Sequence, residues 1–415
     1  MQEYQYIQDI LKEHFAPAIK AQLPTKAPLW AVLKKETEGV YGKRFTIPVT
    51  LGFPESVGAR YPNLYDLPAA ARSTYDQAYI YQKRNYGRIM IDGFSIESAK
   101  GKGGWLDAVT LETKNSSLAF AIDIDRQTMG DGRGHLCEAS GAAVGQVVPV
   151  ELAVSITGNI PATKWLRKGM VVDFFDSTMG HTHATDVTIF SIDSVGATVT
   201  FAAGDDVSLV LDHDVIVKAD TYNPAGAAGS KYGEMIGIQG IIGASNMPEG
   251  VDFEGIEQVA NPEFSSYVHS AAGIITVPLL NGFLDEIEQR TDGEQPDLIV
   301  TTYAMRNKLL ADLTGYRHIV NTLDLKGGWK ALGLTFGQAE IPVLVHPKCP
   351  TGYVYFLNKK HLKVYTLKDL VWDDKGGVLK GVAGKDAFES WYKLYANMGS
   401  DMPNTMGKAY LLTIV

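Results

Sequence analysis

The residues with the best potential for chemistry are histidines and carboxylates in the middle of the chain. His181 and His183 lie two positions apart, and an Asp-His-Asp run follows at 212–214. Histidines at i and i+2 of a strand face the same way and could bind a metal ion. His181, however, follows Gly180 in an expected turn, and no spacing fixes a third ligand. We therefore interpret these residues as an exposed polar loop, with a metal-dependent enzyme built on the two histidines and a carboxylate as the alternative.

Motifs of catalysis and cofactor binding are missing elsewhere. Gly130, Gly132 and Gly134 lack the spacing of a dinucleotide-binding loop, and they end a helical pattern where such a loop would open one. Asp123 and Asp125 lack the sixth-position glycine of a calcium loop. The chain has no GxxxxGK[ST], HExxH or GxSxG motif. We predict a protein that is not an enzyme, with no catalytic residue, no metal ligand and no cofactor.

Composition indicates a multidomain globular protein. The chain has 415 residues, 45% of them hydrophobic and 20% charged, which predicts two or three domains with a core. The net charge of -9 argues against nonspecific nucleic-acid binding, which needs clustered Lys and Arg. Cys137 and Cys349 lie far apart and indicate neither a disulfide framework nor a zinc site. No signal peptide or membrane-spanning run is recognisable, so we expect a soluble protein.

The elements that would position these residues are organised around the stretch 103–137. Leu111, Leu118, Ile122 and Met129 recur at helical spacing, and the glycines from Gly130 onward then break the pattern. The spacing predicts one helix of about 25 residues, roughly 37 Å long, which would act as a spine.

Two segments before the spine are expected to reach away from any compact core. The first is a short amphipathic helix over residues 2–15, with Ile7 and Leu11 on its apolar face. The second, 45–98, is a long hairpin with an irregular tip. Between Lys43 and Arg88 seven basic and three acidic residues give +4, so the rest of the chain carries -13.

A basic arm on an acidic body favours docking onto another copy, while a solvated hairpin is the alternative. The predicted intersubunit contacts are Arg60, Arg72, Arg84, Arg88, Ile7 and Leu11.

The segments after the spine alternate between strands and helices. Five or six short strands between 147 and 222 predict a small inserted β-barrel or sandwich. A helix capped by Asn261 and a second opened by Thr276 and Pro278 follow, and both are expected to flank the spine. A buried strand from Pro296 then enters a third helix, and further short strands follow from Pro342 onward.

The end of the spine, Asp125-Arg126-Gln127 followed by Gly130-Asp131-Gly132-x-Gly134, resembles the spine helix of tailed-bacteriophage major capsid proteins with the HK97-like fold. Further segments resemble that family in the same order along the chain. They are Trp165–Asp173, Pro296–Ile299, Val320–Thr322, Gly327–Gly328, Pro342–Val343, Tyr355–Asn358, Lys360–Tyr365 and Gly384–Glu389.

The resemblance implies an α+β, HK97-like capsid fold with an inserted small β-barrel. The implied divisions are an N-terminal arm (1–44), an extended β-hairpin loop (45–100), the spine helix with part of a peripheral domain (101–145), the barrel (146–222), more of the peripheral domain (223–295), an axial domain (296–370) and a return to the peripheral domain (371–415).

The function implied is that of a major capsid protein, which self-assembles into the icosahedral shell around the double-stranded DNA of a tailed bacteriophage. Partners would be other copies in hexamers and pentamers, a portal, and scaffolding or decoration proteins, with DNA enclosed but not bound by sequence and no membrane. The protein would assemble in the host bacterial cytoplasm and reside in the virion. Because no long leading segment precedes residue 2, we expect a separate scaffolding protein or none. An encapsulin-like cargo compartment is the alternative within the same fold.

Overall fold

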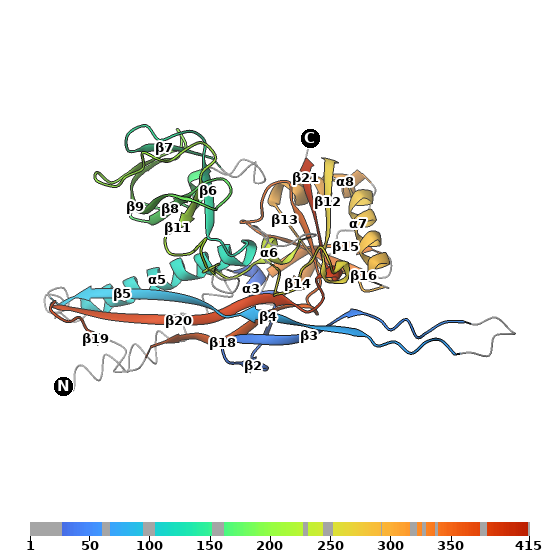
Figure 1. Ribbon diagram of the computed structural model, residues 1–415. Helices are drawn as coiled ribbons and strands as arrows, with labels where there is room; N and C mark the ends of the chain where they lie inside the picture. The colour runs from blue at the N-terminus through green and yellow to red at the C-terminus, as the bar shows by residue number, and fades with distance from the viewer. Residues whose placement is uncertain are drawn as a thin grey trace.

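A computed structural model of the chain describes residues 27–59, 67–93, 104–151, 162–226, 231–243, 252–291, 293–315, 322–325, 329–336, 339–373 and 380–413. This part of the chain is α+β, with three open sheets and one closed barrel arranged around a long helix (Figure 1). No helix in these ranges is both long and apolar enough to cross a membrane.

The long helix α5 (Gly104–Met129) has 26 residues and confirms the predicted spine. Its buried apolar side chains include Phe120, Ala121 and Ile124. Of the expected stripe, Met129 is buried, whereas Leu118 and Ile122 are only half-buried. The C-terminal half of α5 contacts several elements at once, so no single apolar stripe marks its buried side. Gly134 then adopts φ 79°, and a Cβ there would lie 2.2 Å from Oγ1 of Thr221. The abrupt turn after the helix therefore depends on glycine.

A five-stranded sheet lies along α5 (Figure 1). Its strands are β1 (Lys34–Glu36), β18 (Leu362–Trp372), β20 (Ala387–Ser400), β19 (Lys380–Gly381) and β5 (Lys83–Asp92). Strand β20 pairs with β5 along one edge and with β18 and β19 along the other. The sheet contacts α5 through Tyr392, whose ring centroid is 5.1 Å from that of Phe120 and whose hydroxyl is 2.8 Å from Ser116 Oγ. The short helix α3 (Pro28–Val32) adds Leu29 and Trp30 to the same core.

The predicted hairpin is present, but its second limb is divided. Strands β2 (Val40–Tyr41), β3 (Arg44–Gly52) and β4 (Thr74–Tyr81) form a three-stranded sheet that projects from the body (Figure 1). After Gln82 the chain continues as β5, which pairs with β20 and not with β3. The base of the hairpin is fixed by a cluster of Phe45, Ile80 and Tyr365.

The predicted insertion is a closed six-stranded barrel in the order β10-β7-β6-β11-β8-β9. The strands are β6 (His135–Ala139), β7 (Val147–Glu151), β8 (Val171–Phe175), β9 (Thr182–Asp193), β10 (Thr198–Phe201) and β11 (Val215–Lys218). A short 3-10 turn, Ala162–Trp165, precedes β8. Because β6 belongs to the barrel, the expected start at residue 146 was wrong by one strand. Strand β6 has five residues and directly follows α5, and nothing in its local sequence indicated that it pairs with barrel strands.

A seven-stranded sheet, in the order β12-β21-β17-β13-β16-β15-β14, forms the other half of the body. Its strands are β12 (Tyr267–Ile274), β13 (Leu298–Thr301), β14 (Thr322–Leu325), β15 (Trp329–Phe336), β16 (Ala339–Val345), β17 (Val354–Leu357) and β21 (Gly407–Thr413). Helices α7 (Val277–Arg290) and α8 (Tyr303–Gly315) pack on this sheet. Short helical turns α6 (Ile238–Ile241), η5 (Pro262–Phe264) and η6 (Pro403–Thr405) connect the parts.

Two expectations for this half were wrong. The helix predicted after Asn261 is a 3-10 turn followed by strand β12, because Tyr267–Ile274 pairs in parallel with β21 at the far end of the chain. Helix α7, capped as predicted by Thr276, packs against the seven-stranded sheet and not beside the spine, since Phe283 and Ile287 share a core with Phe356.

Candidate functional site

The hairpin exposes apolar side chains that no described part of the chain covers. Phe53 and Val57 are each 85% exposed and Leu67 is 87% exposed, and Tyr75 is also largely exposed. Pairing between β3 and β4 ends at Gly52 and Thr74, so Phe53, Val57 and Leu67 project from a segment with no described sheet partner, whereas Tyr75 lies within β4 opposite Thr50. Several exposed apolar residues on one projecting element are typical of a surface that binds another protein.

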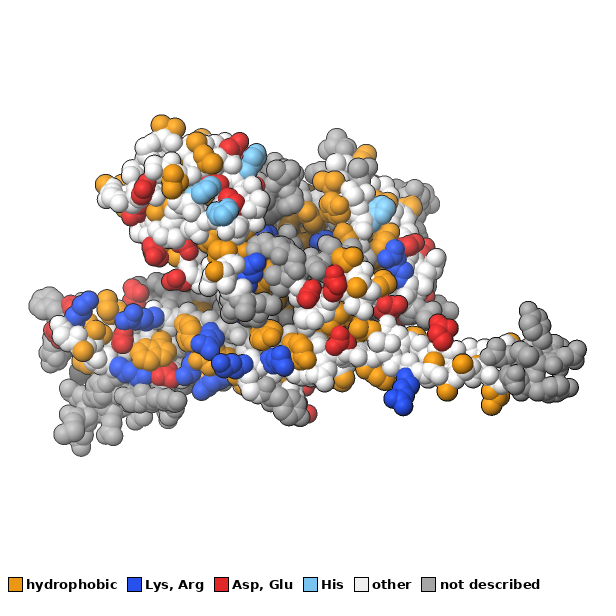
Figure 2. Space-filling model, viewed as in Figure 1, with side chains coloured by type: hydrophobic (Ala, Val, Ile, Leu, Met, Phe, Trp, Pro, Cys, Tyr) orange, Lys and Arg blue, Asp and Glu red, His pale blue; other side chains and the backbone are white. Residues whose placement is uncertain are grey.

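A basic strip, which we define as Arg84, Arg88, Lys380 and Lys393, lies over β5 and the neighbouring strands. Figure 2 shows Lys and Arg side chains gathered over this region. Strand register places Arg84 opposite Tyr395 and Arg88 opposite Trp391, so cations alternate with aromatic rings on one face. Its carboxylates are Glu389, which accepts a 2.9 Å hydrogen bond from Arg88 Nε, and Asp373, which pairs with both lysines. Four cations against two carboxylates leave the strip with a net positive charge.

Within the basic strip, two lysines strongly stabilise the ionised carboxylate of Asp373. Hydrogen bonds from Lys380 and Lys393 lower the pKa of this carboxyl to about 2. The Nζ of Lys380 also lies 3.7 Å from the ring centroid of Trp391, a cation–π contact. Contacts within the chain therefore hold Arg88, Lys380 and Lys393 in place before any partner binds.

The structure divides the six predicted contact residues into three groups. It brings Arg84 and Arg88 together on the basic strip and places Arg72 exposed on the hairpin. The other three, Arg60, Ile7 and Leu11, lie outside the described residues.

The histidines first considered for metal binding do not converge. His183 Nδ1 lies 2.7 Å from Oδ2 of the buried Asp214, which also accepts a hydrogen bond from the Leu211 amide. His181 is exposed, and its backbone amide bonds to Asp176. Within the described residues, neither belongs to a group of three ligand side chains.

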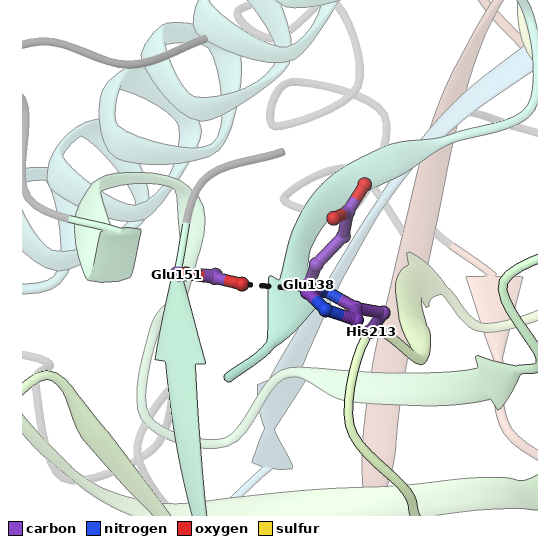
Figure 3. A group of neighbouring side chains, drawn as sticks. All are labelled: Glu138, Glu151 and His213. Atoms are coloured by element: carbon purple, nitrogen blue, oxygen red, sulfur yellow. Dashed lines mark ion pairs between the residues drawn. The ribbon is translucent and has the colours of Figure 1, made fainter. Parts of the chain in front are cut away.

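A different cluster in the barrel does bring three such groups together: Glu138, Glu151 and His213 (Figure 3). Their ligand atoms lie within 4.8 Å of one another. Burial and the nearby Glu151 raise the pKa of the Glu138 carboxyl above its ordinary value. The sequence did not reveal the cluster, because Glu138 and Glu151 become neighbours only through the pairing of β6 with β7. The one signal was His213, in the Asp-His-Asp run.

A charge network, buried around Asp125 and partly exposed around Asp123, joins the C-terminal half of the spine to its surroundings. Asp125 binds His346 and Lys348, each with an N–O distance of 3.0 Å, and both follow β16 of the seven-stranded sheet. Asp123 binds Lys218 of the barrel at 3.1 Å, and Arg126 also contacts this carboxylate at 3.1 Å.

The barrel and the segment after β16 are therefore both held to one helix by charge-assisted hydrogen bonds. Burial alone would raise the pKa of Asp123, but Arg126 and Lys218 hold it below its ordinary value.

A cavity of about 460 Å³ lies between α5, the barrel and β5. Its lining includes Phe120 and Trp165 with several cations, but Lys218 is paired to Asp123 as described. The Ser116 hydroxyl is bonded to Tyr392 and has no base beside it among the lining residues. The cavity therefore offers no nucleophile–base pair within the described part of the chain.

The chain is similar to known proteins in structure but has little sequence identity to them. No protein-family model matches the chain, and no curated protein does. The chain is similar to a capsid protein of cyanophage A-1(L), with 10% identity, 94% of both chains covered and a TM-score of 0.49. It is similar to the SrpI encapsulin of Synechococcus elongatus, with 7% identity, 94% and 88% coverage and a TM-score of 0.44. It is similar to a structure of Mycobacterium phage Bobi, with 9% identity, 93% and 90% coverage and a TM-score of 0.42.

The solved structures similar to this chain are predominantly tailed-phage capsids, the class that the sequence resemblance indicated. All these TM-scores are below 0.5, so the function is argued from the geometry of the chain itself.

Proposed function

We propose that the chain is the repeating subunit of a closed protein shell, the major capsid protein of a tailed bacteriophage with an HK97-like fold. The observation that supports this most is the projecting hairpin, whose apolar side chains Phe53, Val57 and Leu67 are exposed in the single chain. Fully burying such a side chain contributes roughly 1.5–3 kcal/mol. No segment within the described ranges covers these side chains, so we infer that another molecule buries them, and in a homo-oligomer the partner is a second copy.

The charge distribution supports a copy-to-copy contact. The basic strip and Arg72 are positive, while the chain as a whole has a net charge of -9. Opposite potentials on two copies would steer their encounter and fix their register. The proposed intersubunit contacts therefore include Arg72, Arg84 and Arg88, together with Arg60, Ile7 and Leu11 from the sequence.

The parts of the fold take distinct roles in this proposal. Helix α5 and the five-stranded sheet would form a peripheral domain, and the seven-stranded sheet with α7 and α8 an axial domain near the centre of each capsomer. This axial domain would extend beyond the expected 296–370, because β12 and β21 belong to its sheet and α7 packs on it. The hairpin is the extended loop over a neighbouring subunit, and the N-terminal residues are an arm. Hexamers and pentamers of the chain would enclose double-stranded DNA without sequence-specific binding, with portal and scaffolding or decoration proteins as partners.

The charge network around Asp125 and Asp123 suits the mechanical role of a shell subunit. A subunit under outward pressure must transmit force between its halves without deforming. Charge-assisted bonds from one helix to the barrel and to the seven-stranded sheet give that rigidity.

Expression of the full chain tests the proposal. Particles of uniform size by electron microscopy, protecting DNA from nuclease when isolated from infected cells, would support a virus shell assembled in the bacterial cytoplasm. Particles that contain an enzyme and no DNA would instead indicate an encapsulin-like compartment. A chain that stays monomeric at high concentration would contradict both.

A further inference from the structure

Two carboxylates of the barrel face each other directly across neighbouring strands. Glu138 of β6 and Glu151 of β7 are register partners in an antiparallel pair, so their side chains project from the same face. Like charges directly opposite each other destabilise a sheet. The Glu138 side chain is mostly buried, which weakens the screening of this repulsion by water. A positive charge between the two groups would relieve this repulsion.

His213 brings a nitrogen ligand to the same point from a third segment, the turn before β11. Its backbone has φ 64°, a left-handed conformation that few residues other than glycine adopt. In this conformation its Nδ1 lies 3.5 Å from Oε1 of Glu151 (Figure 3). The three ligand atoms lie within 4.8 Å of one another. A tetrahedral zinc ion with bonds of about 2.0–2.2 Å holds its ligand atoms roughly 3.3–3.6 Å apart. Side-chain rotations that move the ligand atoms by about 1 Å would bring the three groups to this separation.

The outer groups of the cluster fit metal ligands. Oδ2 of Asp212 lies 3.6 Å from Nε2 of His213, leaving Nδ1 of that ring for a metal. A carboxylate behind a histidine ligand fixes the ring and increases its basicity. Behind Glu138, the buried Nε2 of His135 has no hydrogen-bond partner among the described residues and lies 3.8 Å from Oε1 of Glu138. Tightening that contact would orient the Glu138 carboxylate toward the centre of the cluster.

We propose that Glu138, Glu151 and His213 bind one divalent transition-metal ion, with zinc as the best fit and the fourth position open to water. One imidazole and two carboxylates suit zinc or manganese better than magnesium or calcium, which prefer oxygen ligands alone. The ion would neutralise the facing carboxylates and join β6, β7 and the turn before β11, which stabilises the barrel. This site is independent of the shell proposal and could exist in a single subunit.

Zinc binding to the metal-stripped full-length protein tests the site. With zinc chloride as the probe and a chromophoric chelator as competitor, we expect one zinc ion per chain. Glu138→Gln, Glu151→Gln and His213→Asn should each weaken binding by at least about tenfold, and asparagine tolerates the left-handed backbone at 213. His181→Asn is the matched control, because His181 is an exposed histidine of the same barrel outside the cluster. It should leave zinc affinity unchanged.

Thermal unfolding separates loss of the site from loss of the fold. Without zinc, Glu138→Gln should unfold at no lower temperature than the unsubstituted protein, because it removes one of two repelling charges. With zinc, only the unsubstituted protein and His181→Asn should gain thermal stability. Absence of stoichiometric zinc binding, or equal affinity in His213→Asn and His181→Asn, would overturn the proposal. So would a gain in stability from zinc that persists in all three cluster variants.

Discussion

Replacing Asp125 by alanine should destabilise the fold by about 3–5 kcal/mol, because Lys348 would keep a buried charge without its counter-ion. Asp125 is 2% exposed, and the Lys348 side chain is 8% exposed. The carboxylate binds Lys348 through one oxygen and His346 through the other, so alanine also removes the partner of His346 Nε2 and leaves Lys348 Nζ with the Ile122 carbonyl in place of a counter-ion. The loss should exceed that from breaking an exposed pair such as Arg290–Glu286, which contributes about 0–1 kcal/mol.

A double-mutant cycle provides the assay. The free energy of unfolding is measured by urea unfolding of the unassembled protein, followed by tryptophan fluorescence. The double variant Asp125→Ala/Lys348→Met should lose less of this free energy than Asp125→Ala alone, since methionine carries no charge. Burial already lowers the pKa of Lys348, and Asp125 opposes that shift. In Asp125→Ala the folded-state pKa falls further below the unfolded value of about 10.4, so the folded state binds fewer protons. The free energy of unfolding of this variant should therefore rise as pH increases toward 10. Additive effects of the two substitutions, or a loss below about 1 kcal/mol, would refute the reasoning.

Two further substitutions test the packing and ionisation described above. Gly87→Ala would place a Cβ 2.1 Å from Cζ of Tyr392 and should lower the free energy of unfolding in urea by about 1–3 kcal/mol. The control Gly381→Ala meets nothing within 4 Å and should change it by less than about 0.5 kcal/mol. Equal effects of the two substitutions would contradict the close packing of β5 on Tyr392. Burial raises the pKa of Glu254 well above its ordinary value, so the stability of the native protein is full below the unfolded pKa of about 4.3 and falls as pH rises toward the folded value. Above an unfolded pKa of about 4.3, Glu254→Gln should have a larger free energy of unfolding than the native protein, and the difference should grow by up to about 1.4 kcal/mol per pH unit. Below that pH the two proteins should be equally stable. Unfolding measured across this pH range checks the prediction, and a difference that does not depend on pH would contradict a buried neutral carboxyl.

Local patterns predicted the elements whose signals are local. Helix α5 could be predicted because its glycine-rich end marks where it must stop, and α7 because Thr276 caps it. The strands of the barrel were largely expected from alternation and turn residues. The projecting hairpin of β3 and β4 was expected because a segment rich in proline and glycine separates two strand-like segments.

The elements that were missed depend on partners far away in the sequence. Strand β5 leaves the hairpin because β20 offers a longer edge, and nothing near β5 in the sequence contains that information. The segment Tyr267–Ile274 carries helix-compatible spacing, yet pairing with β21 makes it a strand. The Glu138–Glu151–His213 cluster likewise arises from three segments that only the closed barrel brings together. Side-chain period alone could not predict any of these contacts.

The central claim is that the hairpin is completed by a neighbouring copy. Sedimentation velocity of the full chain, beside the double variant Phe53→Ser/Val57→Ser, tests it most directly. Both side chains are exposed in the single chain, so the variant should fold with its thermal stability nearly unchanged. Loss of two buried apolar contacts of roughly 1.5–3 kcal/mol each should nevertheless weaken assembly at least about a hundredfold. We expect large closed particles from the unsubstituted chain and free subunits from the variant. Equal assembly of the two proteins, or a monomer in both cases, would contradict the account.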